Sequence, residues 1–293
     1  MSETPDGLLP RPDEHLCVPG RGSLSLWWKN PPRYREERVG AIGHFEAEDA
    51  EAATMLLERA CRRLREEGCT LAIGPFDGST YFRYRAVTEQ SDEPRFRLEL
   101  ATPDTWPGFF QAAGFEVLET YHSSLNENLA YRDPRRARVE ERLKDVRIRS
   151  FRMEEAEEEL KRIYRLSEVV FQNNLFFAPI TEEDYLRLYR PLLPLVNPEL
   201  LLLAEHEGRE VGFFFSIPAE RTDTYIIKSF AILPERRYAG LGNLLVWRSR
   251  DIAQRLGFTR EIHALMWDGN ASSAISSRSG RVIRRYALFA RKL

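Results

Sequence analysis

The stretch RRYAGLGN at residues 236–243 decides the fold, and it follows the strand-like run DTYIIKSFAIL at 223–233. After it, apolar residues recur at helical spacing from Leu241 to Leu256. A strand therefore runs into a glycine-rich loop that opens a helix. Such a loop presents free backbone N–H groups beside the positive end of the helix dipole, and its glycines let the main chain approach an anion. The stretch predicts a phosphate-binding loop.

Two common phosphate loops do not fit these residues. The dinucleotide fingerprint GxGxxG needs a third glycine where Leu245 stands, and the Walker loop needs Gly-Lys followed by Ser or Thr. A plain tight turn that carries a surface arginine at Arg237 is the simpler alternative. We call residues 237–242 the glycine loop.

The segments around the glycine loop predict a whole α/β domain. Residues 146–151 alternate like a short strand, and residues 153–171 show helical periodicity. Thr181 with Asp184 marks the start of a second helix. The other predicted strands are 199–205 and 210–217, which form a hairpin at Gly208, then 259–267 and 282–290.

This element order and this loop resemble the GNAT superfamily of acyl-CoA N-acyltransferases, whose loop reads [Arg or Gln]-x-x-Gly-x-[Gly or Ala]. The resemblance spans residues 146–293, and the loop residues are Arg237, Tyr238, Ala239, Gly240, Leu241 and Gly242. It implies that the loop binds the pyrophosphate of acetyl-CoA, the co-substrate.

The resemblance also implies how the rest of acetyl-CoA is held. The strand at 223–233 would separate from the strand at 259–267 to pair with pantetheine, and Ile232 or a near neighbour would donate its N–H to the thioester carbonyl. Asn270 and Ser273 would face the pantetheine. Asn270 also suits a plain turn and helix cap, because it follows Asp-Gly.

The implied reaction is direct attack of a primary amine on the thioester in a ternary complex, that is, an N-acetyltransferase. Many members of the family use a tyrosine as general acid, but Ser276 or Ser277 stands at that place. Tyr286 and His263 are the substitutes that we name for proton transfer, since a phenol and an imidazole can both carry protons. Both residues equally suit ordinary positions in packed strands.

Two features predict the acceptor side of the site. The aromatic group Phe171, Phe176, Phe177 and Tyr185 falls where the first helices of a GNAT domain cover the acceptor, although such a group is also typical of a core. The loop at 74–80 (GPFDGST) contacts the acceptor or is an ordinary turn.

The first part of the chain repeats the plan without the loop. A helix at 47–67 follows a strand, but residues 46–51 hold four carboxylates and no glycine, and these charges would repel a pyrophosphate. We predict an α/β protein of two GNAT-like domains, each a mixed, mostly antiparallel sheet flanked by helices. The boundaries are a degenerate, partial domain at 1–135, a linker at 136–145 and a complete domain at 146–293.

Composition argues against other classes of protein. The 293 residues carry 43 basic and 45 acidic side chains, so the net charge of -2 gives no field that would attract nucleic acid. No apolar run is long enough for a membrane span and the start lacks a signal-peptide pattern, so we expect a cytoplasmic protein. Three cysteines without a CxxC pair and five histidines without ligand spacing predict no metal site. Exposed strand edges are compatible with a homodimer.

Two other functions stay open at this point. One is a catalytically silent CoA-binding or protein-interaction module, which Ser276 and Ser277 favour. The other is an aminoacyl transferase of the Fem type, which resembles this chain in having tandem GNAT folds. Fem-type proteins need no CoA loop, so the intact glycine loop argues against them.

Overall fold

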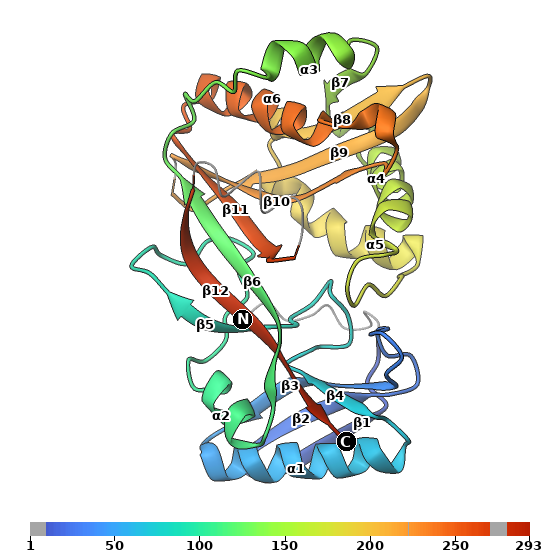
Figure 1. The fold of residues 1–293 in the computed structure, drawn as a ribbon, viewed down its shortest axis with the longest axis vertical. Coiled ribbons are helices and arrows are strands. Elements are labelled where there is room, and N and C mark those ends of the chain that lie inside the picture. The colour runs from blue at the N-terminus through green and yellow to red at the C-terminus, as the bar shows by residue number, and fades with distance from the viewer. Residues whose placement is uncertain (1–9, 222, 270–279) are drawn as a thin grey trace.

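The computed structural model describes residues 10–221, 223–269 and 280–293. Within them, one mixed sheet has the strand order β1-β2-β3-β4-β12-β6-β11-β10-β9-β8-β7, with β5 attached to β12. Helices α1 and α2 lie at one end of the molecule, and α4, α5 and α6 flank strands at the other (Figure 1). We call the residues before α3 (Arg136–Arg142) the first half and those after it the second half.

The first half begins with three antiparallel strands, and two helices then follow among three further strands. Its predicted helix is confirmed, but it starts at residue 50 because Asp49 caps it. Leu56, Ala60 and Leu64 lie on the buried face of this helix. The elements are β1 (Glu14–Val18), β2 (Gly22–Trp27), β3 (Val39–Ala47), α1 (Ala50–Glu66), β4 (Leu71–Gly74), β5 (Ala86–Gln90), α2 (Trp106–Ala112) and β6 (Glu116–Asn126).

The second half follows the predicted order closely, since each predicted segment contains a matching element. The side chain of Thr181 accepts the N–H of Asp184 at 3.1 Å, which confirms the predicted helix start. The elements are β7 (Arg147–Ser150), α4 (Ala156–Phe171), α5 (Glu182–Tyr189), β8 (Leu201–His206), β9 (Arg209–Pro218), β10 (Thr224–Ile232), α6 (Leu241–Arg255), β11 (Arg260–Trp267) and β12 (Arg281–Lys292), with short 3-10 turns at Met153–Glu155, Arg190–Leu195, Pro198–Leu200 and Arg236–Tyr238.

The last strand joins the first half. β12 pairs antiparallel with β4 and β5, and along most of its length with β6. β6 in turn pairs with β11. The two long strands β6 and β12 run between the two ends of the molecule in Figure 1. The sheet is thus continuous across both halves, and the helix α3 lies in the segment that we predicted as a linker. The division into 1–135 and 146–293 stays a prediction.

Aromatic side chains pack the two halves together. Phe176, from the segment after α4, stacks on Tyr34 with ring centroids 5.2 Å apart and also contacts Phe76 at 6.1 Å. Tyr121 of β6 and Tyr286 of β12 belong to the same buried cluster. Burial of such large rings is a strong source of cohesion.

Among the helices that the structure describes, none combines the length and apolar character of a membrane-spanning segment.

Candidate functional site

β10 and β11 form a parallel pair only at their N-terminal ends. Four residue pairs are in register, from Thr224 beside Arg260 to Ile227 beside His263, and no described residue beyond them pairs the two strands. A bulge between Ile227 and Ser229 alters the course of β10 at the same place. The strands therefore separate as the family resemblance implied, and we call this gap the splay.

Backbone donors line the β10 side of the splay. The N–H of Leu233 donates to the carbonyl of Val211 in β9 at 2.9 Å. Successive residues of a strand point their N–H groups to opposite sides. Ala231 and Leu233 therefore face β9, whereas the N–H groups of Phe230 and Ile232 face the splay. Ile232 is the donor that the resemblance implies, and its role stays a prediction; Phe230 is a second N–H on this side that the sequence did not single out.

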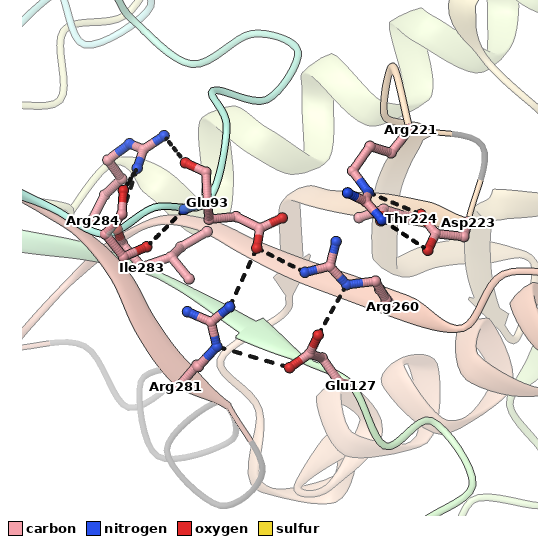
Figure 2. Close-up of polar contacts among 10 residues, drawn as sticks. Glu93, Glu127, Arg221, Asp223, Thr224, Arg260, Arg281, Ile283 and Arg284 are labelled. Atoms are coloured by element: carbon pink, nitrogen blue, oxygen red, sulfur yellow. Dashed lines mark hydrogen bonds and ion pairs between the residues drawn. The ribbon is translucent and has the colours of Figure 1, made fainter.

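An ion-pair cluster fixes the closed end of the splay (Figure 2). Arg260, the first residue of β11, contacts Glu93 at 2.8 Å and Glu127 at 3.2 Å. Arg281, the first residue of β12, contacts the same two carboxylates at 3.3 and 3.8 Å. Glu93 and Glu127 belong to the first half. The partly buried pairs therefore anchor the starts of two second-half strands on the first half.

The first half also shapes the open end of the splay. Leu265 of β11 has a φ of +59°, a conformation that a non-glycine residue keeps only where its surroundings enforce it. Its N–H donates to Ser123 Oγ at 2.9 Å, and its carbonyl accepts from Arg85 Nη1 at 3.1 Å. Arg85 lies over the rings of Tyr84 and Tyr121, 3.9 and 4.3 Å from their centroids. Two first-half side chains thus hold β11 at the point where it leaves β10.

The glycine loop leads from the splay into α6. Gly240 has a φ of +91°, which favours glycine, and α6 starts directly after it with no side chain capping its first N–H groups. A Cβ at Gly242 would meet only ordinary contacts, with Phe230 at 3.5 Å and Ile232 at 3.9 Å. The open amides therefore lie beside the splay donors, in an arrangement that suits an anion at the end of the splay.

The arginine of the loop motif is engaged with acids. Arg237 donates from Nε to Glu235 at 2.9 Å, and its Nη1 lies 3.5 Å from Glu207. Tyr238 is buried, with its hydroxyl 3.1 Å from His206 Nδ1. Two carboxylates therefore compensate the Arg237 charge, and the buried Tyr238 holds the loop against His206.

A second arginine reaches the loop from α3. Arg142 donates to the carbonyl of Ala239, and a Cβ at Gly240 would lie 2.8 Å from its Nη2. Val139 of the same helix lies 3.3 Å from that position. No motif marks Arg142, because it precedes the domain that the resemblance covers. It adds a positive charge beside the predicted pyrophosphate position.

An apolar pocket adjoins the bulge of β10 through Ser229. Phe171 and Tyr185 from the predicted aromatic group line it, whereas Phe176 packs on the first half instead. Tyr81, one residue past the loop at 74–80, enters the pocket from the first half. The other lining residues are Leu160, Ile163, Ser167, Tyr189, Leu192, Leu193, Val196, Leu201, Phe213 and Phe215.

Glu168 is a carboxyl group beside this pocket that the sequence analysis missed. Its Oε1 is buried, and no hydrogen-bond partner for it is present among the described residues. Burial raises the pKa of Glu168, and its charge acts on the hydroxyls of Tyr81 and Tyr164. An acid next to Ser167, on the predicted buried face of its helix, was the available signal. Such a group can pair with an amine or accept its proton.

His263 belongs to a buried ionic network. Its side chain is 4% exposed, and Nε2 lies 2.8 Å from Glu261 Oε1. Glu261 also accepts from Arg250 of α6 at 3.0 Å and from the Tyr225 hydroxyl at 2.5 Å. Burial opposes ionisation of Glu261, but His263 and Arg250 outweigh it and hold the pKa of this carboxyl well below its usual range. The arrangement favours a structural role for His263.

Tyr286 is also engaged in the interior. It is 1% exposed, its hydroxyl donates to Glu99 at 2.5 Å and lies 3.1 Å from Ser123 Oγ. Burial first and the Glu99 charge second raise the pKa of Tyr286, which weakens it as an acid. The two residues that we named for proton transfer thus lie in different hydrogen-bond networks, and both carry structural contacts.

Some predicted residues lie outside the described part of the chain. Asn270 and Ser273 do, as do Ser276 and Ser277, so their roles stay predictions. Among residues 10–221, 223–269 and 280–293, no group of three or more His, Cys, Asp or Glu side chains has an arrangement that could hold a metal ion.

Comparisons with known families and curated proteins bear on these findings. Residues 154–274 match the family model described as "Acetyltransferase (GNAT) family". A comparison with curated protein sequences gives no significant match.

Solved structures share the fold at low identity. A glucosamine N-acetyltransferase region of a fungal multi-domain beta-N-acetylglucosaminidase is 15% identical, with a TM-score of 0.56 over 92% of this chain, which spans only 31% of that protein. A GCN5-related N-acetyltransferase from Sphaerobacter thermophilus is 14% identical, with a TM-score of 0.56 and coverage of 93% and 76%. A tandem GNAT protein from the clavulanic acid biosynthesis pathway is 12% identical, with a TM-score of 0.52 and coverage of 96% and 84%. These likenesses confirm the GNAT fold.

Proposed function

We propose, from the premise that residues 154–274 of this chain form a domain of the GNAT acetyltransferase family, that the protein transfers the acetyl group of acetyl-CoA to a primary amine. The family match supports an acyltransferase, and the acetyl donor and the amine acceptor are our proposal. One observation carries it. The open splay, with free N–H groups on one side, ends at the uncapped N-terminus of α6.

The donor side follows from this geometry. The first amides of α6 and the positive end of the helix dipole suit a pyrophosphate, and Arg142 adds a cation there. The pantetheine would pair with the β10 edge in the splay. The N–H of Phe230 or Ile232 would then donate to the thioester carbonyl, where negative charge develops during attack.

The acceptor side is the apolar pocket beside Ser229. A primary amine must lose a proton to attack, and the CoA thiolate must gain one. Glu168 is the best-placed described acid for the first task, because its Oε1 is buried without a partner and its pKa is raised. We therefore propose that Glu168 pairs with the acceptor ammonium and takes its proton.

One observation favours the silent CoA-binding module as a second candidate. His263 and Tyr286 are both committed to buried contacts, so neither supplies an exposed acid for the thiolate. The two candidates differ in one measurable property. Only an enzyme releases free CoA thiol in proportion to added amine.

Titration of acetyl-CoA tests the proposal at its first step. Gly242→Asp is the decisive variant, because its Cβ has room and an acid at a helix N-terminus stabilises the fold. Gly240 is less suitable, since its positive φ would strain any replacement. We expect micromolar-range binding by the wild type and a loss of at least about tenfold in the variant, from charge repulsion at the cradle.

Gly242→Ser is the matched neutral control and should lose much less affinity than Gly242→Asp. If wild-type protein does not bind acetyl-CoA, the proposed function fails. If it binds but releases no thiol with any amine in a broad panel, the silent module replaces the enzyme.

A further inference from the structure

Two cations, one from β10 and one from the first half, lie near the point where β10 and β11 separate. Lys228 lies within the bulge of β10, directly after the last residue that pairs with β11. Arg85 is bonded to the carbonyl of Leu265 on β11, two residues past the end of that pairing. The Arg85 charge acts on the Lys228 ammonium, so the two groups are near one another. Together they bracket the point where the strands begin to separate.

Neither cation has an acidic partner within the described ranges. Arg85 is 4% exposed and makes its contacts with Leu265, with the Tyr84 hydroxyl and with aromatic rings, while its buried Nε has no hydrogen-bond partner there. Lys228 is half-buried, and no ion pair or hydrogen bond of its side chain occurs in the part of the chain that the structure describes. The segment 270–279 contains no carboxylate that could serve either of them.

Two carboxylates of the first half lie near the aromatic rings that surround Arg85, and both make contacts with other residues. Glu99 and Glu119 act electrostatically on the tyrosines around Arg85. Glu99 pairs with Arg284 at 3.0 Å and accepts the Tyr286 hydroxyl. Glu119 accepts Trp267 Nε1 at 2.7 Å. Glu99 is therefore already paired with a cation, and Glu119 makes no ion pair or hydrogen bond with Lys228 or Arg85 among the described residues.

A protein interior rarely keeps two neighbouring cations without a counter-charge. Removal of charges from water costs free energy that only a partner of opposite sign returns, and like charges add to this cost. Burial and the charge of Arg85 accordingly lower the pKa of Lys228 to about 8. The cost is explained if an anion fills the site during function.

We propose that Lys228 and Arg85 form an anion site that receives a carboxylate carried by the acceptor, an inference that rests on the proposed function. Ser229 follows Lys228 and lines the apolar pocket, so the site and the pocket adjoin. An acceptor with an apolar body in the pocket would thus place its carboxylate at Lys228. The acceptor class is an amine that also bears an acid group, such as an apolar amino acid.

Binding without any CoA tests the anion site separately from the acetyltransferase reaction. The probes are phenylacetate and its neutral isostere phenylacetamide, measured by calorimetry on the whole protein. We expect the wild type to prefer phenylacetate by at least about tenfold, the value of one charge-assisted hydrogen bond. Lys228→Met should abolish this preference and Lys228→Arg should restore much of it.

Lys144→Met is the matched control, because Lys144 is 64% exposed and makes only a surface pair with Glu141. It should leave the preference unchanged. Equal affinity of the wild type for the two probes would overturn the anion site, and so would a preference that survives in Lys228→Met. Failure of acetyl-CoA to bind would overturn the proposed function but would leave this test intact.

A second comparison identifies which substrate carries the carboxylate. With acetyl-CoA as donor, phenylalanine should be acetylated with a kcat/KM at least about tenfold above that of phenethylamine, and Lys228→Met should remove the difference. Succinyl-CoA carries the carboxylate on the donor instead. If it binds more tightly than acetyl-CoA in a manner that depends on Lys228, the assignment to the acceptor is wrong.

Discussion

Each half contains a parallel strand pair connected by a helix, but the two helices begin differently. In the second half, α6 starts after Gly240 with no side-chain cap. In the first half, Asp49 accepts the N–H of Ala52 at 2.8 Å and also binds Arg21 at 3.0 Å. The N-terminus of α1 therefore already holds an anion of its own. This capped start is the physical basis for our prediction that the carboxylates at 46–51 would repel a pyrophosphate there.

The gaps between the paired strands differ as well. β3 and β4 pair in parallel over three residue pairs, from Val39 beside Leu71 to Ala41 beside Ile73. Beyond them, the chain fills its own gap. The N–H of Phe76 donates to the carbonyl of Ile42 at 2.8 Å, and Asp77 accepts the N–H of His44 at 2.6 Å. No equivalent pairing occupies the splay among the described residues.

The comparison separates the fold from the site. The same arrangement of strand, helix and strand appears in both halves, yet a cap and a short loop satisfy the backbone of one, while the other keeps its donors free. A few residues decide whether such a unit can bind a ligand or only supports its neighbour. Four variants test this conclusion, from the largest expected effect to the smallest.

The largest effect should come from the buried ion pair between β11 and α6 in the second half. The buried Glu261 of β11 pairs with Arg250 of α6, and Glu261→Gln removes the negative charge of this pair. We expect the free energy of unfolding to fall by about 3–5 kcal/mol, measured by urea denaturation at pH 7. Because the folded pKa of Glu261 is lowered, its contribution is present at neutral pH. It is lost as the pH falls below the usual Glu value of about 4.3.

Glu141→Gln is the control, since Glu141 is 75% exposed and its one ion pair among the described residues is with Lys144. Its effect should stay within about 0.5 kcal/mol. A Glu261→Gln variant as stable as this control would show that the open half needs no such support.

The next variant fills the closed gap further. A Cβ at Gly43 would lie 2.3 Å from the carbonyl oxygen of Phe76, so Gly43→Ala must displace backbone. We expect a loss of about 3 kcal/mol in the free energy of unfolding. Gly242→Ala in the open half should change it by less than about 1 kcal/mol, because its Cβ has room. Equal losses in the two variants would contradict a difference between the gaps.

A third variant tests the carboxyl of the open half. Glu168→Gln should lower kcat/KM for amine acetylation by about 100-fold, since both the partner of the acceptor ammonium and the general base are lost. Because the pKa of Glu168 is raised, the wild-type rate should fall as the pH drops through that raised value, and this limb should disappear in the variant. A normal rate and an unchanged pH profile in Glu168→Gln would exclude Glu168 as proton acceptor.

The smallest effect concerns Asp49, the N-cap of α1 in the first half. Asp49→Ala removes the acceptor of the Ala52 N–H, and the melting temperature should fall by a few degrees at most. The variant should still not bind a second acetyl-CoA, because the segment at 75–77 fills the gap. A calorimetric stoichiometry of two would show that the cap alone blocks the first half.

Local patterns predicted the local features. The glycine loop, the hairpin at Gly208 and the cap at Thr181 each depend on residues close in sequence, and each is present. The GNAT fold follows from the order of such elements, and the comparisons confirm it. The sequence also placed acids at the start of the first-half helix, and the structure shows that one of them, Asp49, caps that helix.

Long-range pairing was not predictable from these patterns. β6 reads EVLETYHSSLN, a polar mixture without clean alternation, and it lies between β12 and β11, two strands that come far later in the sequence. The roles of His263 and Glu168 depend on which neighbours the fold brings to them. One meets the buried Glu261, and the other meets no partner among the described residues. From residue type alone, we named His263 for proton transfer and did not consider Glu168.

The position of β12 between β4 and β6 has a consequence for how the protein folds during synthesis. On the ribosome, the first half is synthesised long before residues 281–292, yet these residues form the strand between β4 and β6. The nascent first half therefore waits with an unfilled slot in its sheet, and strands that wait unpaired are exposed to wrong partners. A protein made as two separate pieces would leave this slot open. Folding is thus completed only when the last strand arrives, and the two halves mature as one unit.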